Sequence, residues 1–181
     1  SGALLHIDST GTESHIAIPR RSLAWSPDGE LLAVPGAIRP VHIRDGQTAE
    51  LLRTLDLAEE NRDSYLSWSP DGARLAICLY IPTQATLWDR RTWEQAGRAE
   101  VPGAYLYSLV WRPDGTQFAT CGDGSGILLW DAITLSRQPH RFAQDGVTYS
   151  VSWSPDGRRL AAGSNDGLVK AWRVDSPGDE V

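Results

Sequence analysis

The sequence predicts an all-β protein made of repeated four-stranded units, and three observations support this prediction. First, a tryptophan followed by Ser or Arg and then Pro-Asp-Gly occurs four times, beginning at Trp25, Trp68, Trp111 and Trp153. Second, these tryptophans lie 43, 43 and 42 residues apart, a period typical of β-propellers. Third, apolar and polar residues alternate on either side of each turn, as they do in strands with one buried face. We therefore expect β-propeller blades.

The first two strands of each repeat flank the Pro-Asp-Gly turn. In such a turn proline fixes φ, aspartate bonds to the local backbone and glycine accepts a positive φ where the chain reverses. The alternating apolar residues are Tyr105, Tyr107, Leu109 and Trp111 before the third turn, and Val147, Tyr149, Val151 and Trp153 before the fourth. After the turns, short apolar second strands are expected at residues 31–34, 75–79, 118–121 and 160–163.

The third and fourth strands complete each repeat. In the last repeat, small residues at 164–167 predict a tight turn and residues 168–172 the third strand that follows it. A fourth, more polar strand is expected at residues 49–55 and 138–142. The third strand ends in a Trp-Asp pair or in a pair that keeps one of the two: Trp88-Asp89, Trp130-Asp131, Trp172-Arg173, Arg44-Asp45 and Ile7-Asp8.

Through these in-phase copies the chain resembles the WD-repeat family, which is named for that Trp-Asp pair, over essentially its whole length. The style of the repeats is similar to that of bacterial WD repeats. Typical members have a Gly-His pair before the inner strand, and the histidine joins a buried hydrogen-bond tetrad. The matching positions here hold other residues: Ile16, Glu59, Pro102 and Gln144. The missing histidine implies blades that are held mainly by strand pairing and apolar packing.

We expect a single β-propeller segment over residues 1–181 that does not close by itself. The third-strand motif occurs five times but the inner hairpin four times. The chain would thus begin with a third strand at 3–7 and an outer strand at 13–18. The expected division is a blade remnant, four repeats and a tail: residues 3–18, 19–58, 59–101, 102–143, 144–175 and 176–181.

Three alternatives follow for an incomplete ring: a fragment of a longer propeller, a half-propeller that pairs with a second chain, or a four-bladed monomer. WD-family rings usually have about seven blades, which would need a longer chain. Methionine is absent and Ser1-Gly2 is typical of the residues left by tag removal, so a fragment is favoured. We expect it to form a homodimer, because exposed blade edges and apolar flanks must be covered.

Composition argues against several classes of partner. The net charge of −6 and the pI near 5.1 disfavour a nucleic-acid surface. The sequence has no run of 18 apolar residues, so no membrane span is predicted. Cys78 and Cys121 hold equivalent positions in the second strands of neighbouring blades, where blades diverge too far for a disulfide. Reduced, buried thiols indicate the cytoplasm.

No motif predicts catalysis, a metal site or a cofactor. The glycine-rich stretch 122–126 lies where each repeat turns between its second and third strands, and no helix follows it as a phosphate loop requires. The four histidines have no cysteine partner at ligand spacing, and Ser125 and Ser164 do not fit a nucleophile elbow.

The resemblance therefore implies a non-catalytic module for protein–protein interaction or scaffolding, whose partner is unknown. The alternative is an accessory propeller domain that gates or positions substrate for a larger, hydrolase-type enzyme. In the family, partners dock on the face formed by the turns that precede the inner strands and those between the second and third strands. Trp93, outside the repeated slots, either packs on its own blade or is an exposed anchor. The expected partner-binding residues are Arg20, Arg39, Arg62, Pro82, Tyr105, Asp123 and Asn165.

Overall fold

The computed structural model describes residues 22–36, 40–57, 64–79, 83–101, 105–142 and 146–174. Within these ranges every regular element is a β-strand, and the strands form four antiparallel sheets. The predicted all-β class is confirmed. The strands expected at 3–7 and 13–18 and the tail at 176–181 lie outside the described residues, and the repeat boundaries remain predictions.

Each sheet is one blade, numbered here in chain order, and its strands follow one another across the sheet. Blade 1 contains β1 (Ala24–Trp25), β2 (Leu31–Pro35), β3 (Val41–Asp45) and β4 (Leu51–Leu55). Blade 2 contains β5 (Ser64–Trp68), β6 (Arg74–Leu79), β7 (Gln84–Asp89) and β8 (Gln95–Glu100). Blade 3 contains β9 (Tyr105–Trp111), β10 (Gln117–Asp123), β11 (Gly126–Asp131) and β12 (Arg137–Phe142). The described part of blade 4 contains β13 (Thr148–Trp153), β14 (Arg159–Ser164) and β15 (Val169–Arg173).

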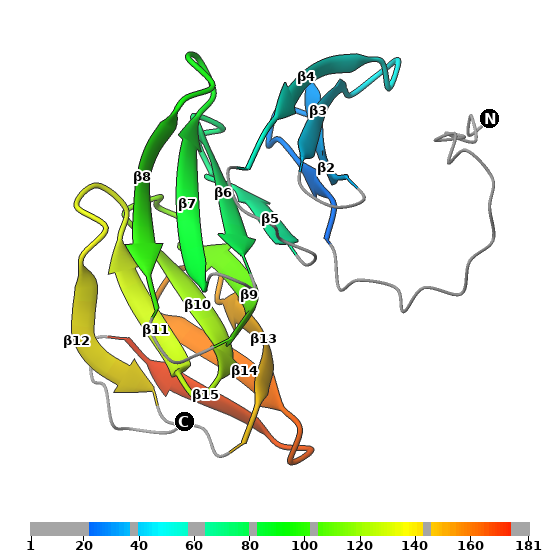
Figure 1. Ribbon diagram of the computed structural model, residues 1–181. Helices are drawn as coiled ribbons and strands as arrows, with labels where there is room; N and C mark the ends of the chain where they lie inside the picture. Colours follow the sequence, from blue (N-terminus) through cyan, green and yellow to red (C-terminus); the bar gives the residue numbers. More distant parts are fainter. Residues whose placement is uncertain are drawn as a thin grey trace, which may run out of the picture.

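The four blades follow one another around an arc that does not close, from blade 1 in blue and cyan to blade 4 in orange and red (Figure 1). The inner strands β1, β5, β9 and β13 contact one another in that order. The arrangement confirms the expected incomplete ring of propeller blades.

Hydrogen bonds within the Pro-Asp-Gly turns explain why they recur. In blade 1 the Ser26 hydroxyl donates to Asp28 Oδ1 over 2.6 Å, and the same oxygen accepts the Glu30 N–H. Gly29 has a φ of 73°, a conformation that glycine adopts without steric cost. The predicted turn chemistry is thus confirmed. The same hydroxyl-to-carboxylate bond occurs in the turns of blades 2 and 4, at Ser69–Asp71 and Ser154–Asp156.

The aspartate that ends the third strand of blades 1, 2 and 3 also organises a turn. Asp131 Oδ1 accepts the N–H groups of Ile133 and Thr134 at 3.0 and 2.7 Å, and the Thr134 hydroxyl at 2.9 Å. The next residue, Leu135, has a φ of 56°. Ala49 and Trp93 hold the corresponding positions at φ 60° and 58°. The aspartate at the end of the third strand therefore forms a turn in which the residue after the threonine has a left-handed backbone, with or without a tryptophan before the aspartate.

Three apolar cores lie between consecutive blades. In blades 2 and 3 the second strand presents large side chains to the preceding blade and small ones to the following blade. In β6, Leu75, Ile77 and Leu79 pack in the core shared with blade 1, whereas Ala76 and Cys78 pack in the core shared with blade 3. These contacts therefore place large side chains of one blade on a neighbouring blade.

Both thiols lie in these cores, as expected from the sequence. Cys78 and Cys121 are free and buried. Burial, and secondarily the neighbouring Cys121, raises the pKa of the Cys78 thiol well above its usual value. Burial raises the pKa of Cys121 to about 12. Neither thiol is therefore ionised near neutral pH.

In blades 2 and 3 a hydrogen bond between a tryptophan and a threonine supplements the apolar packing. This pair was not predicted from the sequence. The Trp130 indole Nε1 donates to Thr120 Oγ1 at 2.9 Å, and the Trp88 indole Nε1 donates to Thr86 Oγ1 at 3.1 Å. Thr120 lies on the second strand but Thr86 on the third. Their cross-strand partners are Leu128 and Ile77, respectively, so either strand can bring a hydroxyl close to the indole.

Candidate protein-interaction face

The inner-turn face is the end of the blades where the inner strands begin and where turns join the second strand to the third. Of the residues expected to bind a partner, Tyr105, Asp123 and Asn165 are described and all lie at this end. The other four lie outside the described residues: Arg20, Arg39, Arg62 and Pro82.

In blade 3, the face is formed by the first residue of β9 and the last residue of β10. Tyr105 and Asp123 are register partners across these two strands. Gly122 lies so close to this pair that a Cβ on it would fall 1.6 Å from the Tyr105 carbonyl oxygen. Gly124 turns the chain into β11 at a φ of 76°. The glycine-rich stretch is therefore a tight hairpin, as predicted.

In blade 4, Asn165 ties the start of the inner strand to the turn between the second and third strands. The Val147 N–H donates to Asn165 Oδ1 at 3.0 Å, and the Asn165 N–H donates to the Val147 carbonyl at 3.0 Å. Gly146, at φ 81°, has no room for a side chain, because a Cβ would lie 2.2 Å from Asn165 Oδ1. These bonds hold this part of the face in one conformation.

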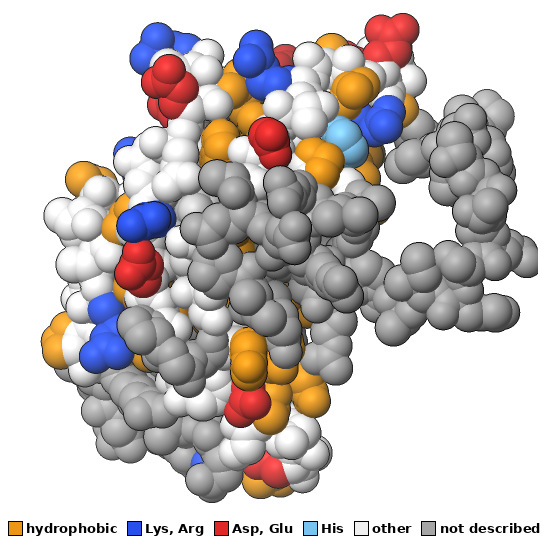
Figure 2. Space-filling model, in the orientation of Figure 1, with side chains coloured by type: hydrophobic (Ala, Val, Ile, Leu, Met, Phe, Trp, Pro, Cys, Tyr) orange, Lys and Arg blue, Asp and Glu red, His pale blue; other side chains and the backbone are white. Residues whose placement is uncertain are grey.

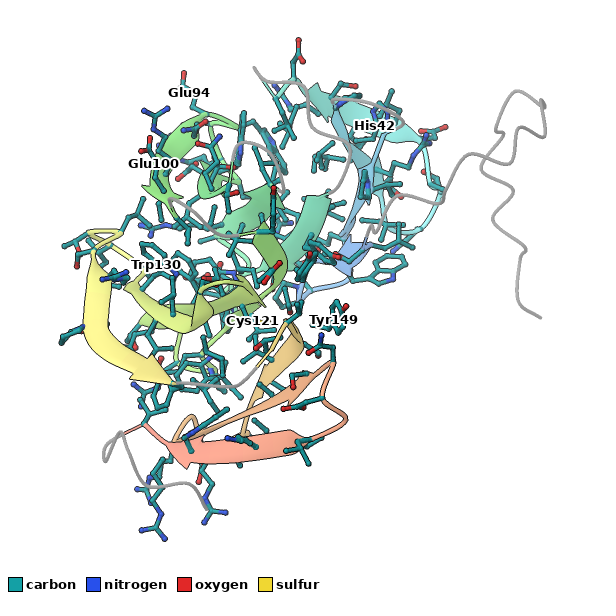
Figure 3. The ribbon with its side chains drawn as sticks, turned by 60° about the horizontal axis from the view of Figure 1, so that its bottom comes forward. His42, Glu94, Glu100, Cys121, Trp130 and Tyr149 are labelled. Carbon is teal, nitrogen blue, oxygen red and sulfur yellow. The ribbon has the colours of Figure 1, made fainter. Side chains whose placement is uncertain are left out.

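Two β-bulges aim tyrosines toward each other across blades 3 and 4. The register of β9 skips Tyr107 and that of β13 skips Tyr149, so each is the extra residue of a bulge. A bulge redirects the side chain at which it occurs. The two rings lie with centroids 5.5 Å apart and planes tilted by 51°. Figure 3 shows Tyr149 on the inner strand of blade 4, on the concave side of the arc.

The resulting face combines aromatic surface with acidic and amide groups. Tyr105 and Tyr149 are each 43% exposed, and Asp123 and Asn165 flank them. Asp166 follows Asn165, and hydrogen bonds from the Ser164 hydroxyl and the Leu168 N–H lower the pKa of its carboxyl. In Figure 2, hydrophobic side chains lie beside acidic ones over β13 and β14.

The bulged tyrosines were missed as site residues, although their signal was present. Both were assigned from sequence to the buried alternation of a strand. Tyr107 and Tyr149 lie at the same distance before Trp111 and Trp153, which a comparison between repeats could have detected.

Trp93 lies at the opposite end of the strands, after the Trp-Asp pair of blade 2. It is partly buried, and its ring meets the Trp68 ring edge-on, with centroids 6.1 Å apart. It packs against the core between blades 1 and 2.

The described residues contain neither a cluster of three or more His, Cys, Asp or Glu side chains suited to a metal ion nor a helix able to span a bilayer. What the face offers is an amphipathic surface on a rigid repeat scaffold. Fold and face together define a repeat β-propeller protein.

Comparison with known proteins identifies the kind of repeat. Residues 99–131 and 135–173 match the family model described as WD domain, G-beta repeat. These ranges contain β9 to β15, which form blade 3 and the described part of blade 4, and they include the Trp-Asp pair at 130–131. Over these two stretches the chain has WD-type repeats, as expected from the sequence.

Several curated proteins are similar to parts of the chain. Echinoderm microtubule-associated protein-like 2 of Rattus norvegicus is 29% identical over 141 residues, 72% of this chain and 21% of that protein. Protein HIR1 of Cryptococcus neoformans is 33% identical over 110 residues, 58% of this chain and 12% of that protein. WD repeat-containing protein slp1 of Schizosaccharomyces pombe is 26% identical over 136 residues, 73% of this chain and 26% of that protein. The chain thus spans between 12% and 26% of the length of these relatives.

Proposed function

We propose that this chain is a non-catalytic WD-repeat module that binds a protein partner through the inner-turn face. The observation that supports this most is the tyrosine group on neighbouring inner strands, where Tyr105 and Tyr149 are each 43% exposed. Tyrosines give a large, rigid contact area with a polar tip, which is why they are enriched where proteins bind one another.

The surrounding groups favour a particular partner chemistry. Asp123 and Asp166 add negative charge, and the chain as a whole has a net charge of −6. A peptide segment with an apolar or aromatic anchor and a nearby Lys or Arg fits such a surface, because the anchor packs on the tyrosines and the cation meets the carboxylates.

Selection of binders from a displayed library of random peptides tests this function. We expect the selected peptides to bind the wild-type chain and to lose about 30-fold or more in affinity on Tyr105→Ala or Tyr149→Ala, as at other aromatic hot spots. Ile133→Ala is the matched control, because Ile133 is 82% exposed at the opposite end of blade 3. Binders that are insensitive to both tyrosines would contradict the proposed face.

Trp93 is proposed as a second, separate contact. Its ring is only partly buried against Trp68, so one side is open to a partner. Trp93→Ala should weaken either partner binding or self-association; a variant with unchanged fold, binding and assembly would exclude the anchor role.

We also propose that two copies associate as a homodimer. The described part of blade 4 has three strands, and the two ends of the arc do not meet. Light scattering coupled to size exclusion should give about twice the 19.8 kDa mass of one chain. A single-chain mass at every concentration would contradict association.

Two further features of the setting are proposed on chemical grounds. Free thiols at Cys78 and Cys121 favour a reducing compartment such as the cytoplasm. The net negative charge disfavours nucleic acid as the partner. No observation on the described residues specifically favours the alternative role as an accessory domain of a larger hydrolase-type enzyme.

A further inference from the structure

Consecutive blades meet through contacts that recur from one pair of blades to the next. Each blade has a back face toward its predecessor and a front face toward its successor, and the contact surface between two blades is called a seam here. At the first two seams the inner-strand tryptophan of the later blade donates its indole N–H to the earlier blade. Trp68 Nε1 reaches the Ala24 carbonyl and Trp111 Nε1 reaches the Ser67 carbonyl, each at 3.1 Å.

The Pro-Asp-Gly turns also stack in one direction. The turn glycine of the later blade lies against the turn proline of the earlier one at all three seams. A Cβ built on the glycine would lie 3.5, 3.8 and 3.6 Å from the proline Cδ in three pairs: Gly72–Pro27, Gly115–Pro70 and Gly157–Pro113. A back face therefore presents a tryptophan and a glycine, and a front face presents a carbonyl and a proline.

Blade 1 has a back face of this kind that no described blade covers. Trp25 is 51% exposed, whereas Trp68 and Trp111 are each 7% exposed. Nothing lies within 4 Å of a Cβ built on Gly29. The Trp25 ring lies close to Gly46, since a Cβ built on that glycine would be 2.9 Å from the ring. In blade 2 the Trp68 ring lies in the same way beside Arg90, which is the counterpart of Gly46.

Blade 4 has the complementary front face. Ser152 holds the place of Ala24 and Ser67, and Pro155 that of the other turn prolines. Ala161, the counterpart of the fully buried Ala76 and Ala119, remains half-exposed here. The small residues that would receive large side chains of a following blade are thus in place.

The charges at these two faces are also matched. At the first seam Arg90 pairs with Asp28 and Glu30 of the preceding blade, at 2.5 and 2.9 Å. On blade 1 an uncharged Gly46 replaces Arg90, and on blade 4 a cation, Arg158, replaces Glu30. Hydrogen bonds from the Ser154 hydroxyl and the Arg158 N–H, together with the Arg158 charge, already lower the pKa of Asp156 within its own turn.

We propose that the back face of blade 1 docks on the front face of blade 4 of a second copy of this chain. In this fourth kind of seam the Trp25 indole donates to the Ser152 carbonyl, and Gly29 lies against Pro155. The contact is heterologous, so each copy contributes one face of each kind and two copies close with two identical seams. Two sets of four blades give a ring at the upper end of the usual four to eight. The inference rests on the proposed homodimer and specifies its interface.

Two variants, one for each face, test the seam. Trp25→Ala removes the indole from the back face, and Ala161→Glu puts a charge on the front face; Ile133→Ala is the control. The wild type and the control should have the mass of two chains. Each face variant should weaken association by about 30-fold or more, as expected for a central tryptophan or a buried unpaired charge. Circular dichroism verifies that each variant keeps its strands.

Mixing the two face variants distinguishes this seam from any other dimer. A mixed pair contains one intact seam, from Trp25 of one copy and Ala161 of the other, so the mixture should associate more tightly than either variant alone. Failure of the mixture to do so would overturn the seam. A wild-type dimer that is insensitive to Trp25→Ala would also overturn it while leaving the homodimer intact. A monomeric wild type would overturn both, and filaments would overturn ring closure.

Discussion

Trp25 and Trp111 occupy the same position in the repeat, yet they differ in solvent exposure. Each ends an inner strand and precedes a Pro-Asp-Gly turn, but Trp25 is 51% exposed and Trp111 is 7% exposed. Trp111 has blade 2 behind it and bonds to the Ser67 carbonyl, whereas no described blade lies behind Trp25. Burial in this fold thus depends on the neighbouring blade and not on the repeat that encodes the residue.

The third seam sharpens this comparison. Trp153 has a blade behind it, but its indole Nε1 is buried without a hydrogen-bond partner. Arg112 takes the place of the usual serine, and its guanidinium lies 5.5 Å from the centre of the Trp153 ring. The neighbouring blade therefore covers part of Trp153, and through Arg112 it gives the ring a contact that the tryptophans of the other seams make with a different residue or lack.

The largest expected effect compares the two tryptophans directly. Trp111→Ala removes a buried ring that packs on Phe118 at 5.5 Å, so the free energy of unfolding should fall by about 3–5 kcal/mol. Trp25→Ala should cost less than about 1 kcal/mol, because half of the ring is already in water. Denaturant unfolding at protein concentrations too low for association measures both. Equal losses in the free energy of unfolding would show that the repeat position alone sets how much each tryptophan stabilises the fold.

A contact within one blade should not depend on neighbours in this way. Thr120→Val keeps the shape of the side chain but leaves the buried Trp130 indole N–H without its acceptor. The free energy of unfolding should fall by about 1–3 kcal/mol. Thr120→Ser, the control, retains the hydroxyl and should lose less. If valine and serine have the same effect, methyl packing and not the hydrogen bond stabilises this position.

The turn after the third strand of blade 1, which ends in Arg44-Asp45, offers a smaller gain in stability. Ala49 has a φ of 60°, which costs an L-residue about 1–2 kcal/mol relative to glycine. Ala49→Gly should therefore stabilise the chain by roughly 0.5–1 kcal/mol after the greater freedom of glycine in the unfolded state is subtracted. Ala96→Gly, in the exposed part of β8, is the control and should destabilise. Thermal unfolding of both variants gives the comparison, and a loss at Ala49 would contradict strain there.

The smallest effect concerns the first seam in acid. Hydrogen bonds from the Ser26 hydroxyl and then from Arg90 hold the pKa of Asp28 well below its usual value. Because the folded pKa is depressed, the stabilisation is present above the unfolded value of about 3.9 and is lost as the pH falls below it. Asp71 bonds to Ser69 in the same way, and Arg90 is not among the causes of its lowered pKa.

Carboxyl titration by NMR separates the two causes. Arg90→Ala should raise the pKa of Asp28 and leave that of Asp71 unchanged, because only Asp28 has its partner in the next blade. An unchanged pKa of Asp28 would show that bonds within its own turn, from Ser26 and the Glu30 N–H, set this pKa and that the contact between the blades contributes nothing.

Features that depend on residues close in the chain could be predicted from the sequence. The Pro-Asp-Gly turns, the four-stranded order and the hairpin at residues 122–126 all follow from local bonding and alternation, and the structure has them. The inner-turn face was predicted in part, since Tyr105, Asp123 and Asn165 lie on it. Its bulged tyrosines were not predicted, because a bulge reverses the side of the strand that a residue faces.

The sequence by itself determined that this chain forms WD-type blades, because turn chemistry and hydrophobic period act over a few residues. Only the tertiary structure decided which equivalent repeat positions differ in burial and contacts. The exposed Trp25, the Arg112 contact with Trp153 and the ring pair of Tyr107 with Tyr149 each require residues from two blades. Contacts between residues more than 40 positions apart depend on how blades stack, and a pattern read along one repeat contains no information on its neighbour.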